Sequence, residues 1–254
     1  MKKIALLLAF VISLESIFAW NWLGHKVIVE IAKAHLTPKA QKNIERYMPY
    51  DIVKDASWMD YHRKDKAINY TTHWHSFRYD KKSLKHDLNF TLRRGDVVRA
   101  LEVAEYNLAH YRELTDSAVV MNLRMAIHFV GDMHCPCHAV PYRTRGAKLM
   151  YKGKPIGFHK FFDKSPALVH PKKNYREISA DIDDYSKRKY KSITAGTVKD
   201  WADDTAKNVD FVWDKYNKAG LEVEITPELE KVVNTQLRNA GYRLAAFLNR
   251  YFGK

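Results

Sequence analysis

The chain has 254 residues, which is enough for one large domain or two small ones. Hydrophobic residues make up 46% of it and aromatic residues 13%, so an intrinsically disordered chain is excluded and a sizeable core is supported. Lys and Arg number 43 against 29 Asp and Glu, a formal net charge of +14. This balance favours a polyanionic partner, such as nucleic acid or an anionic membrane surface, although a generally basic solvated surface has the same composition.

The first 19 residues have the pattern of an export signal. Lys2 and Lys3 precede an apolar stretch, residues 4–12, that is too short to cross a bilayer, and residues 17–19 form a plausible cleavage site. We therefore predict a mature chain that begins at Trp20 and carries 41 basic and 28 acidic residues. No other stretch approaches transmembrane length, so we expect an exported protein, secreted or periplasmic, with no stable membrane insertion.

The start of the mature chain predicts two helices and two candidate site residues. Apolar residues recur with helical spacing over residues 27–32, and Thr37 followed by Pro38 has the pattern of an N-cap that opens a second helix. Asp60 follows in the next segment, and His75 ends a His-Trp-His run. A carboxylate and an imidazole this far apart are common in any protein, so by themselves they are weak evidence for a site.

The centre of the chain predicts a buried helix over residues 118–130. This run is apolar around most of a helical circumference and is broken mainly by Asn122 and Arg124. It leads into His128 and Asp132, which are four residues apart and therefore project from one helical face. Buried polar groups of this kind need compensation from their surroundings.

A metal ion is the compensation that the neighbouring residues favour. Pro136 stops the helix, and His138 can return to the same place from outside it. Nitrogen and carboxylate ligands that converge in this way suit zinc. A core His hydrogen-bonded to a nearby Asp is the alternative, but a second pair with the same spacing, His159 and Asp163, favours the metal site.

The two cysteines of the chain, Cys135 and Cys137, flank Pro136. Export permits a disulfide, but a bridge across a single residue closes a small, strained ring. Three interpretations therefore remain open: packed free thiols, a redox-labile bridge, and an auxiliary metal ligand.

The remainder of the chain predicts one long loop and then more helices. Residues 139–158 form the longest irregular segment, and loops of this length are often functional. The basic run 186–191 is interpreted as a solvated stretch, one helix is expected to start at Trp201, and Thr226 with the following Pro caps another. No repeat, linker or alternating strand pattern is present, so residues 20–254 are predicted to form a single, mainly α-helical domain.

The run His-Phe-x-Gly-Asp-Met-x-x-Pro-x-His at residues 128–138 resembles the zinc-dependent S1/P1 nucleases. Trp20 as the first mature residue and His25 shortly after it strengthen this resemblance, which extends to the Gly-Tyr-Arg-Leu-Ala of residues 241–245. The family shares its helical fold with bacterial zinc-dependent phospholipases C. The resemblance thus implies a single helical domain of the phospholipase C/P1 nuclease type, and we expect a monomer.

The resemblance also implies a cluster of three zinc ions. One zinc would be held by Asp60, His75, His128 and Asp132, a second by His138, His159 and Asp163, and the third by the amino group and carbonyl of Trp20 with His25 and a bridging Asp132. Asp132 and Asp60 are the expected catalytic carboxylates. His75 is preferred to His73 because the family's ligand commonly follows a Trp, and His134 is expected to orient a ligand from outside.

Substrate contacts are less closely implied, because this chain departs from fungal members of the family. After the ligand His those members have a base-stacking aromatic and an acid, where this chain has Ser76 and Arg78. Their Gly-Gly-Asn is Gly-Ala-Lys here, at residues 146–148. From this chain's own residues we expect a stacking face and backbone-following cations: Phe77 or Tyr79 for the first, Arg145 and Lys148 for the second.

The function implied is an exported phosphodiesterase that hydrolyses single-stranded DNA and RNA and removes 3′-phosphates from nucleotides, with zinc activating water. A zinc phospholipase C is one alternative. Those enzymes typically have Glu in place of Asp163 and a shorter gap between the residues that correspond to His138 and His159. A catalytically silent, zinc-dependent nucleic-acid-binding protein is the other alternative.

Overall fold

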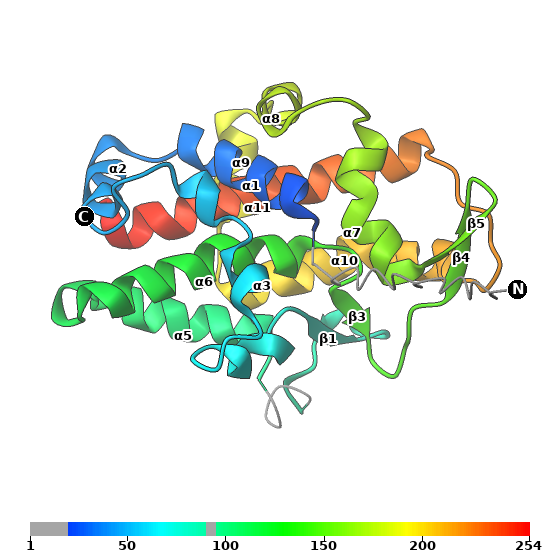
Figure 1. Cartoon of the computed structure of the whole chain (residues 1–254), viewed down its shortest axis with the longest axis horizontal. Coiled ribbons are helices and arrows are strands. Elements are labelled where there is room, and N and C mark those ends of the chain that lie inside the picture. Colours follow the sequence, from blue (N-terminus) through cyan, green and yellow to red (C-terminus); the bar gives the residue numbers. More distant parts are fainter. Residues whose placement is uncertain (1–19, 90–94) are drawn as a thin grey trace, which may run out of the picture.

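The computed structural model describes residues 20–89 and 95–254, so the predicted export signal lies outside the described residues. Helices dominate the fold (Figure 1), which confirms the mainly α class. In chain order they are α1 (Trp22–Ala34), α2 (Pro38–Glu45), α3 (Trp58–His62), α5 (Val97–Ala109), α6 (Asp116–His134), α7 (Phe158–Val169), α8 (Tyr175–Ile182), α9 (Lys187–Thr194), α10 (Val198–Tyr216) and α11 (Pro227–Phe252). Short 3₁₀ turns at Ile52–Asp55, Asn69–His73 and Tyr111–Glu113 connect some of them.

The long helices α6 and α11 form the centre of the fold. α11 packs against α1, α2 and α6, and α6 packs against α5 on another side (Figure 1). Gly241 lies where α11 meets α1, and a Cβ at this position would stand 2.6 Å from the side chain of Ile31. Only glycine permits so close an approach of the two helices. None of the helices in the described residues is both long and apolar enough to cross a membrane.

Local capping sets where the helices begin. Thr37 and Thr226 each accept a hydrogen bond from the main-chain N–H three residues on, and each is followed by Pro at the first helical position, as predicted. α10 begins earlier than the predicted start at Trp201. The reason is a reciprocal capping box, in which Thr197 and Asp200 each bind the other's main-chain N–H.

The central helix α6 is buried, as its apolar pattern predicts. Its two polar exceptions are both satisfied. The amide of Asn122 donates to the carbonyl of Ala118 at 2.8 Å, and the guanidinium of Arg124 donates to Asp55 at 2.8 Å while lying over the ring of Trp58. These polar groups therefore do not oppose the burial of the helix.

Short strands, which the sequence pattern does not predict, complete the fold. They are β1 (Phe77–Asp80), β2 (Lys85–His86), β3 (Ala139–Pro141), β4 (Lys148–Tyr151) and β5 (Lys154–Gly157). The first three form one sheet in the order β2-β1-β3, and β4 pairs with β5 in a hairpin. The expectation of an irregular segment over residues 139–158 is therefore wrong in part. The hairpin turns at Lys152 and Gly153, both with positive φ. Asn or Asp followed by Gly is the usual sequence of such a turn, and because Lys stands at the first position here, the sequence does not predict it.

Candidate metal centre

The candidate ligands come from six separate parts of the chain and meet in the interior. His25 lies on α1, Asp60 on α3, and His75 in the turn before β1. His128 and Asp132 lie on α6, whereas the remaining three come from the turn after α6 and from α7: His138, His159 and Asp163. All of these side chains are buried except that of His159, which is 43% exposed.

The carboxylate of Asp132 lies at the middle of the cluster. Its Oδ2 is 2.8 Å from Nδ1 of His75 and 3.2 Å from Nε2 of His128. Its other oxygen, Oδ1, is 3.4 Å from Nε2 of His25. Asp60 approaches the same imidazoles, with Oδ1 3.6 Å from His75 and 3.7 Å from His128. A carboxylate whose two oxygens face different imidazoles has the geometry of a bridge between two cations.

A second group of donors adjoins the first. Nε2 of His138 lies 3.1 Å from Nε2 of His159, which in turn lies 3.3 Å from Oδ2 of Asp163. His138 is also 3.8 Å from Oδ1 of Asp163. Spacings of this size are those of ligands around a single ion at bond lengths of about 2.0–2.2 Å.

Main-chain hydrogen bonds orient the imidazoles. Nδ1 of His128 donates to the carbonyl of Ala56 at 2.9 Å, which directs its Nε2 at the carboxylates. β1 and β3 run parallel with Phe77 opposite Ala139, so the residues just before them, including His75 and His138, lie next to each other. Nδ1 of His138 donates to the carbonyl of His75, and its Nε2 therefore faces the second group.

Gly131 makes room for His25 between the helices. A Cβ at Gly131 would stand 2.7 Å from Nδ1 of His25. The imidazole of His25 stacks on that of His128, with ring centroids 4.2 Å apart. The glycine thus lets a side chain of α1 reach the carboxylate of Asp132 across the surface of α6.

Trp20 lies close to the second group. Its side chain is fully buried and packs against Gly24, where an added Cβ would stand 3.0 Å from Trp20 and from Pro166 of α7. The main-chain N–H of Asn21 donates to the carbonyl of Asp163 at 2.8 Å. These contacts hold the first residue of the predicted mature chain beside the candidate ligands.

Hydrogen bonds within the cluster do not satisfy all of its donor atoms, whereas bound metal ions would. Several of their buried atoms have no hydrogen-bond partner: both oxygens of Asp60, Oδ1 of Asp132, both ring nitrogens of His25 and Nε2 of His75. Buried polar atoms without partners are costly and are rare in folded proteins. Imidazole and carboxylate donors are also the ligands that zinc prefers. The cluster can therefore hold metal ions.

Burial and mutual charge determine the protonation of the cluster. Burial lowers the pKa of His138 to about 3, and partial burial lowers that of His159 to about 4, so both are neutral at pH 7 and have a lone pair for a cation. Burial disfavours charge on His128 as well, but Asp132 and Asp60 outweigh it and raise its pKa to about 9. Against burial, His128 and His75 hold the pKa of Asp132 well below its ordinary value. This carboxylate is therefore ionised.

His134 does not have the predicted role. Its Nδ1 donates to the carbonyl of Val130 at 2.7 Å, and its Nε2 accepts from Nη1 of Arg243 at 2.8 Å. Both ring nitrogens are thus used away from the candidate ligands. Arg243 also donates to Asp204 and to the carbonyl of Ile193, so His134 links α6 to the packing of α9, α10 and α11.

The predicted stacking residues are also wrong. Phe77 and Tyr79 are fully buried, and the hydroxyl of Tyr79 donates to Asp210 at 2.8 Å. Side chains alternate along a strand, so with these two inside, Arg78 between them points the other way. It lines a pocket of about 360 Å³ with four residues of the loop after β3: Tyr142, Arg143, Thr144 and Arg145.

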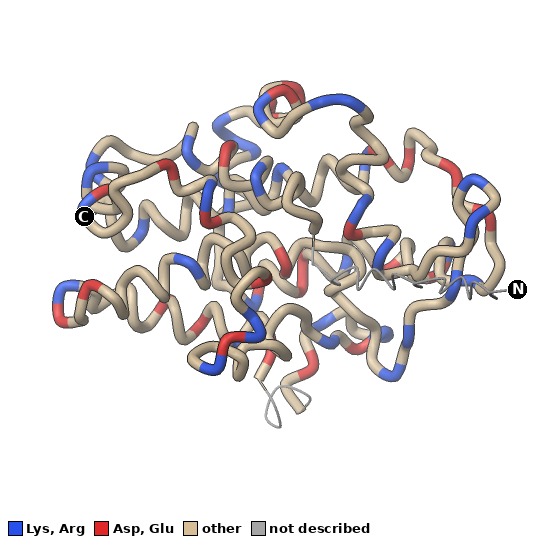
Figure 2. Tube along the Cα trace, viewed as in Figure 1, with Lys and Arg blue, Asp and Glu red and all other residues tan. Residues whose placement is uncertain are grey.

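Sequence reasoning missed Tyr142 and Arg143 at this pocket. Tyr142 is 48% exposed, and the guanidinium of Arg143 lies over its ring at 5.2 Å from the centroid. The sequence signal that could have found them is the run Tyr-Arg-Thr-Arg at residues 142–145, which combines an aromatic residue with two arginines and contains no acidic residue. Both predicted cationic contacts are exposed: Arg145 lies on the same connection to β4, and Lys148 is the first residue of β4. Figure 2 shows basic but no acidic positions along this connection.

The fold is mainly α and brings buried His and Asp side chains together, which defines a helical protein with a candidate metal centre. The chain belongs to the S1/P1 nuclease family, whose model matches residues 20–253. It is 24% identical to Endonuclease 2 of Arabidopsis thaliana over 273 residues, which cover 94% of this chain and 92% of that protein. It is 22% identical to Nuclease P1 of Penicillium citrinum and to Nuclease PA3 of a Penicillium species, over 92% of this chain and 98% of each relative. Family membership supports nuclease activity and a nucleic-acid substrate.

Proposed function

We propose that this protein is an exported, monomeric, zinc-dependent phosphodiesterase that hydrolyses single-stranded DNA and RNA and removes 3′-phosphates from nucleotides. The observation that carries the proposal is the position of Asp132, whose Oδ1 faces His25 and whose Oδ2 faces His75 and His128. A carboxylate so placed suits two adjacent ions. Two-metal sites are a common solution for phosphodiester hydrolysis.

Three ions would be held by the residues around this carboxylate. Asp60, His75, His128 and Asp132 form the first site, and His138, His159 and Asp163 the second. The third needs the free amino group of Trp20, with its carbonyl, His25 and Asp132. The buried location of Trp20 and its tie to α7 support that site, provided that export processing exposes the amine.

Zinc bound here would lower the pKa of a water molecule, neutralise phosphoryl charge and stabilise the leaving oxygen. The residues of the chain supply the charge, spacing and orientation that this chemistry needs. Asp132 and Asp60 hold negative charge against the imidazoles and fix the spacing between sites. His128 is locked by the carbonyl of Ala56, so its lone pair does not have to reorient during turnover. The exposed His159 lies on the side from which substrate can approach.

The strand of nucleic acid would continue from this centre into the pocket of Arg78 and Tyr142. β3 joins the two places, and the five residues from His138 to Tyr142, which are four steps of about 3.3 Å, span about 13 Å in an extended chain. Tyr142 offers a stacking face for a base, in place of the buried Phe77 and Tyr79. Among the described residues no acidic side chain forms an ion pair with Arg143 or Arg145, which leaves both guanidiniums available to phosphate.

A comparison of substrates tests the proposal. Purified protein that begins at Trp20 is assayed on denatured DNA, RNA, a 3′-mononucleotide and phosphatidylcholine, with and without chelator, and its zinc is measured. We expect about three zinc ions per chain, hydrolysis of the first three substrates and loss of activity on chelation. Cleavage of phosphatidylcholine instead would identify a phospholipase C. Zinc-dependent binding without any hydrolysis would identify a silent binding protein.

A further inference from the structure

The turn between α6 and β3 carries both thiols of the chain into the second ligand group. The carbonyls of Pro136 and Ala139 both accept from the indole N–H of Trp213, at 3.0 and 2.8 Å. Cys135 and Cys137 are buried within this turn and are not bridged to each other. Because α10 holds the turn from outside, the positions of the two sulfur atoms are fixed by tertiary packing.

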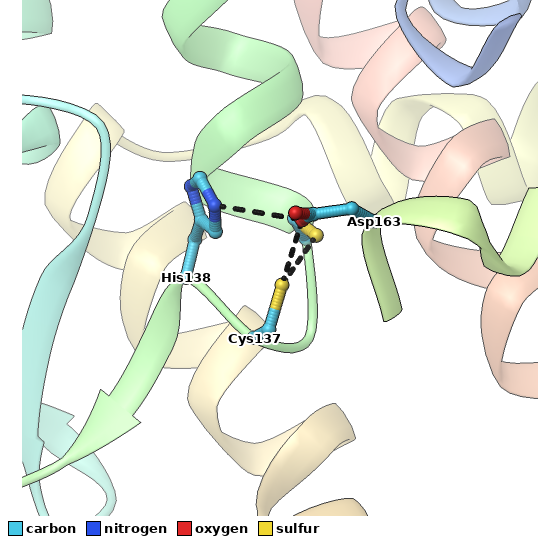
Figure 3. A group of neighbouring side chains, drawn as sticks. Cys137, His138 and Asp163 are labelled. Carbon is cyan, nitrogen blue, oxygen red and sulfur yellow. Dashed lines mark hydrogen bonds and ion pairs between the residues drawn. The ribbon is translucent and has the colours of Figure 1, made fainter. Parts of the chain in front are cut away.

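The sulfur of Cys137 lies against a candidate metal ligand. Its Sγ is 3.1 Å from Oδ1 of Asp163, and Nε2 of His138 is 3.8 Å from the same oxygen. Figure 3 shows these three side chains directed toward one another from the turn and from α7. With Cys135, the group offers four donor atoms that all lie within 4.8 Å of one another.

These spacings are close to those that one ion requires. Zinc binds sulfur at about 2.3 Å and nitrogen or oxygen at about 2.0–2.2 Å, so two of its ligands stand at most about 4.6 Å apart. The two carboxylate oxygens of Asp163 also face different partners. Oδ2 faces His159 at 3.3 Å, and Oδ1 faces Cys137.

Charge favours one thiolate rather than two. A dication with one carboxylate and one thiolate is neutral, whereas a second thiolate would leave a net negative charge in a buried place. The Sγ atoms of Cys135 and Cys137 are 3.2 Å apart, a distance at which the remaining thiol can donate to the sulfur of the other. Cys137 is the one that contacts Asp163, so it is the candidate ligand.

We propose that Cys137 binds, as a thiolate, the metal ion that His138 and Asp163 hold, and that the thiol of Cys135 donates a hydrogen bond to its sulfur. This inference rests on the proposed function, because it requires the second metal ion. On binding, the thiol releases its proton to solvent and the sulfur lone pair forms the metal bond. A sulfur ligand would favour zinc over harder ions such as Mg²⁺ or Mn²⁺ at this position.

Cobalt substitution tests the proposal by absorption spectroscopy. Thiolate bound to Co²⁺ produces a charge-transfer band in the near ultraviolet, which imidazole and carboxylate ligands do not. The chain has only two cysteines, so any such band belongs to Cys135 or Cys137. The protein beginning at Trp20 is loaded with Co²⁺, and its spectrum is compared with those of Cys137→Ser, Cys135→Ser and the control His110→Ala, which changes an exposed histidine outside the cluster.

We expect the band in the unaltered protein, its loss in Cys137→Ser, and its persistence in Cys135→Ser and in His110→Ala. X-ray absorption of the unaltered zinc protein should show a zinc–sulfur distance of about 2.3 Å, a measurement that needs no variant. Bound metal without sulfur, or a spectrum that Cys137→Ser leaves unchanged, would overturn this inference and leave the zinc enzyme intact. A protein that binds no metal would overturn both, and elemental analysis of the same samples separates the two cases.

Discussion

The imidazole of His138 donates from Nδ1 to the main-chain carbonyl of His75, although 63 residues separate them. The parallel pairing of β1 with β3 makes this contact possible, because the main-chain N–H of Phe77 donates to the carbonyl of His138 at 2.9 Å. Two short strands thus join a ligand of the first proposed site to a ligand of the second. The sheet is small, but it sets the distance between the two sites.

Asp132→Asn should be the most damaging single substitution in the cluster. The amide has one oxygen in place of two and carries no charge, so it cannot bridge two ions. We expect a loss of more than one zinc per chain and a fall in activity of at least about 100-fold, measured by elemental analysis and by nuclease assay. Asp96→Asn is the matched control, because Asp96 is another buried carboxylate paired with a histidine, His86 at 2.6 Å. Equal effects of the two changes would contradict a bridging role.

A residue added before Trp20 should remove one zinc ion and most of the activity. The α-amino group, with an ordinary pKa of about 7.7–8.0, becomes an amide that has no lone pair to give. The variant should still fold, because the buried indole is unchanged. Zinc content and rate are compared between Met-Trp20 protein and correctly processed protein, with Trp20→Phe carrying a free amine as the control. If Met-Trp20 protein keeps its zinc and its rate, Trp20 is only an apolar anchor.

Gly131→Ala should displace His25 and empty the site that this histidine shares with Asp132. The new Cβ would stand 2.7 Å from Nδ1 of His25, which is closer than packing allows. Overpacking of this kind costs about 1–3 kcal/mol of stability. Thermal unfolding and zinc analysis check the change. Gly157→Ala is the control, since a Cβ there meets no atom within 4 Å. A variant that keeps all its zinc would show that His25 is not a ligand.

Salt should weaken the cleavage of long single strands far more than the turnover of a mononucleotide. Counterion release scales with the number of phosphates contacted, at a slope of about 0.7 per phosphate for single strands. Arg143→Ala with Arg145→Ala should reduce this slope by about 1 and leave mononucleotide turnover unchanged. Arg112→Ala is the matched control, because Arg112 lies over Tyr111 much as Arg143 lies over Tyr142. An unaltered slope in the double variant would exclude this pocket from strand binding.

The metal-free protein should lose stability as the pH rises from 6.5 to above 9. Burial lowers the pKa of His128, but Asp132 and Asp60 outweigh it and raise the value to about 9 in the folded state, against 6.5 when unfolded. The resulting stabilisation, at most about 3.4 kcal/mol, is complete below pH 6.5 and disappears through pH 9. Thermal unfolding of chelated protein across this range measures it. His128→Asn should flatten the dependence, and an equally steep curve in that variant would assign the effect to other groups.

Local interactions determined much of this protein from its sequence. Helical periodicity, the caps at Thr37 and Thr226, and the four-residue spacing of His128 and Asp132 depend only on neighbours along the chain. The same is true of the central run of residues 128–138, from which the family was inferred and which the family match confirms. These features predicted the mainly α class and the set of residues that the structure brings together.

Tertiary packing decided the side-chain contacts between residues that are far apart in the sequence. One face of β1 is buried in the fold, and only the pairing of β1 with β3 and the contact with Asp210 put Phe77 and Tyr79 on that face. His134 points to Arg243, a residue 109 positions away, rather than to the ligands. The contact of Cys137 with Asp163 likewise arises from the packing of α7 against the turn after α6. Sequence spacing fixes relative direction only within one element, so contacts between elements require the assembled fold.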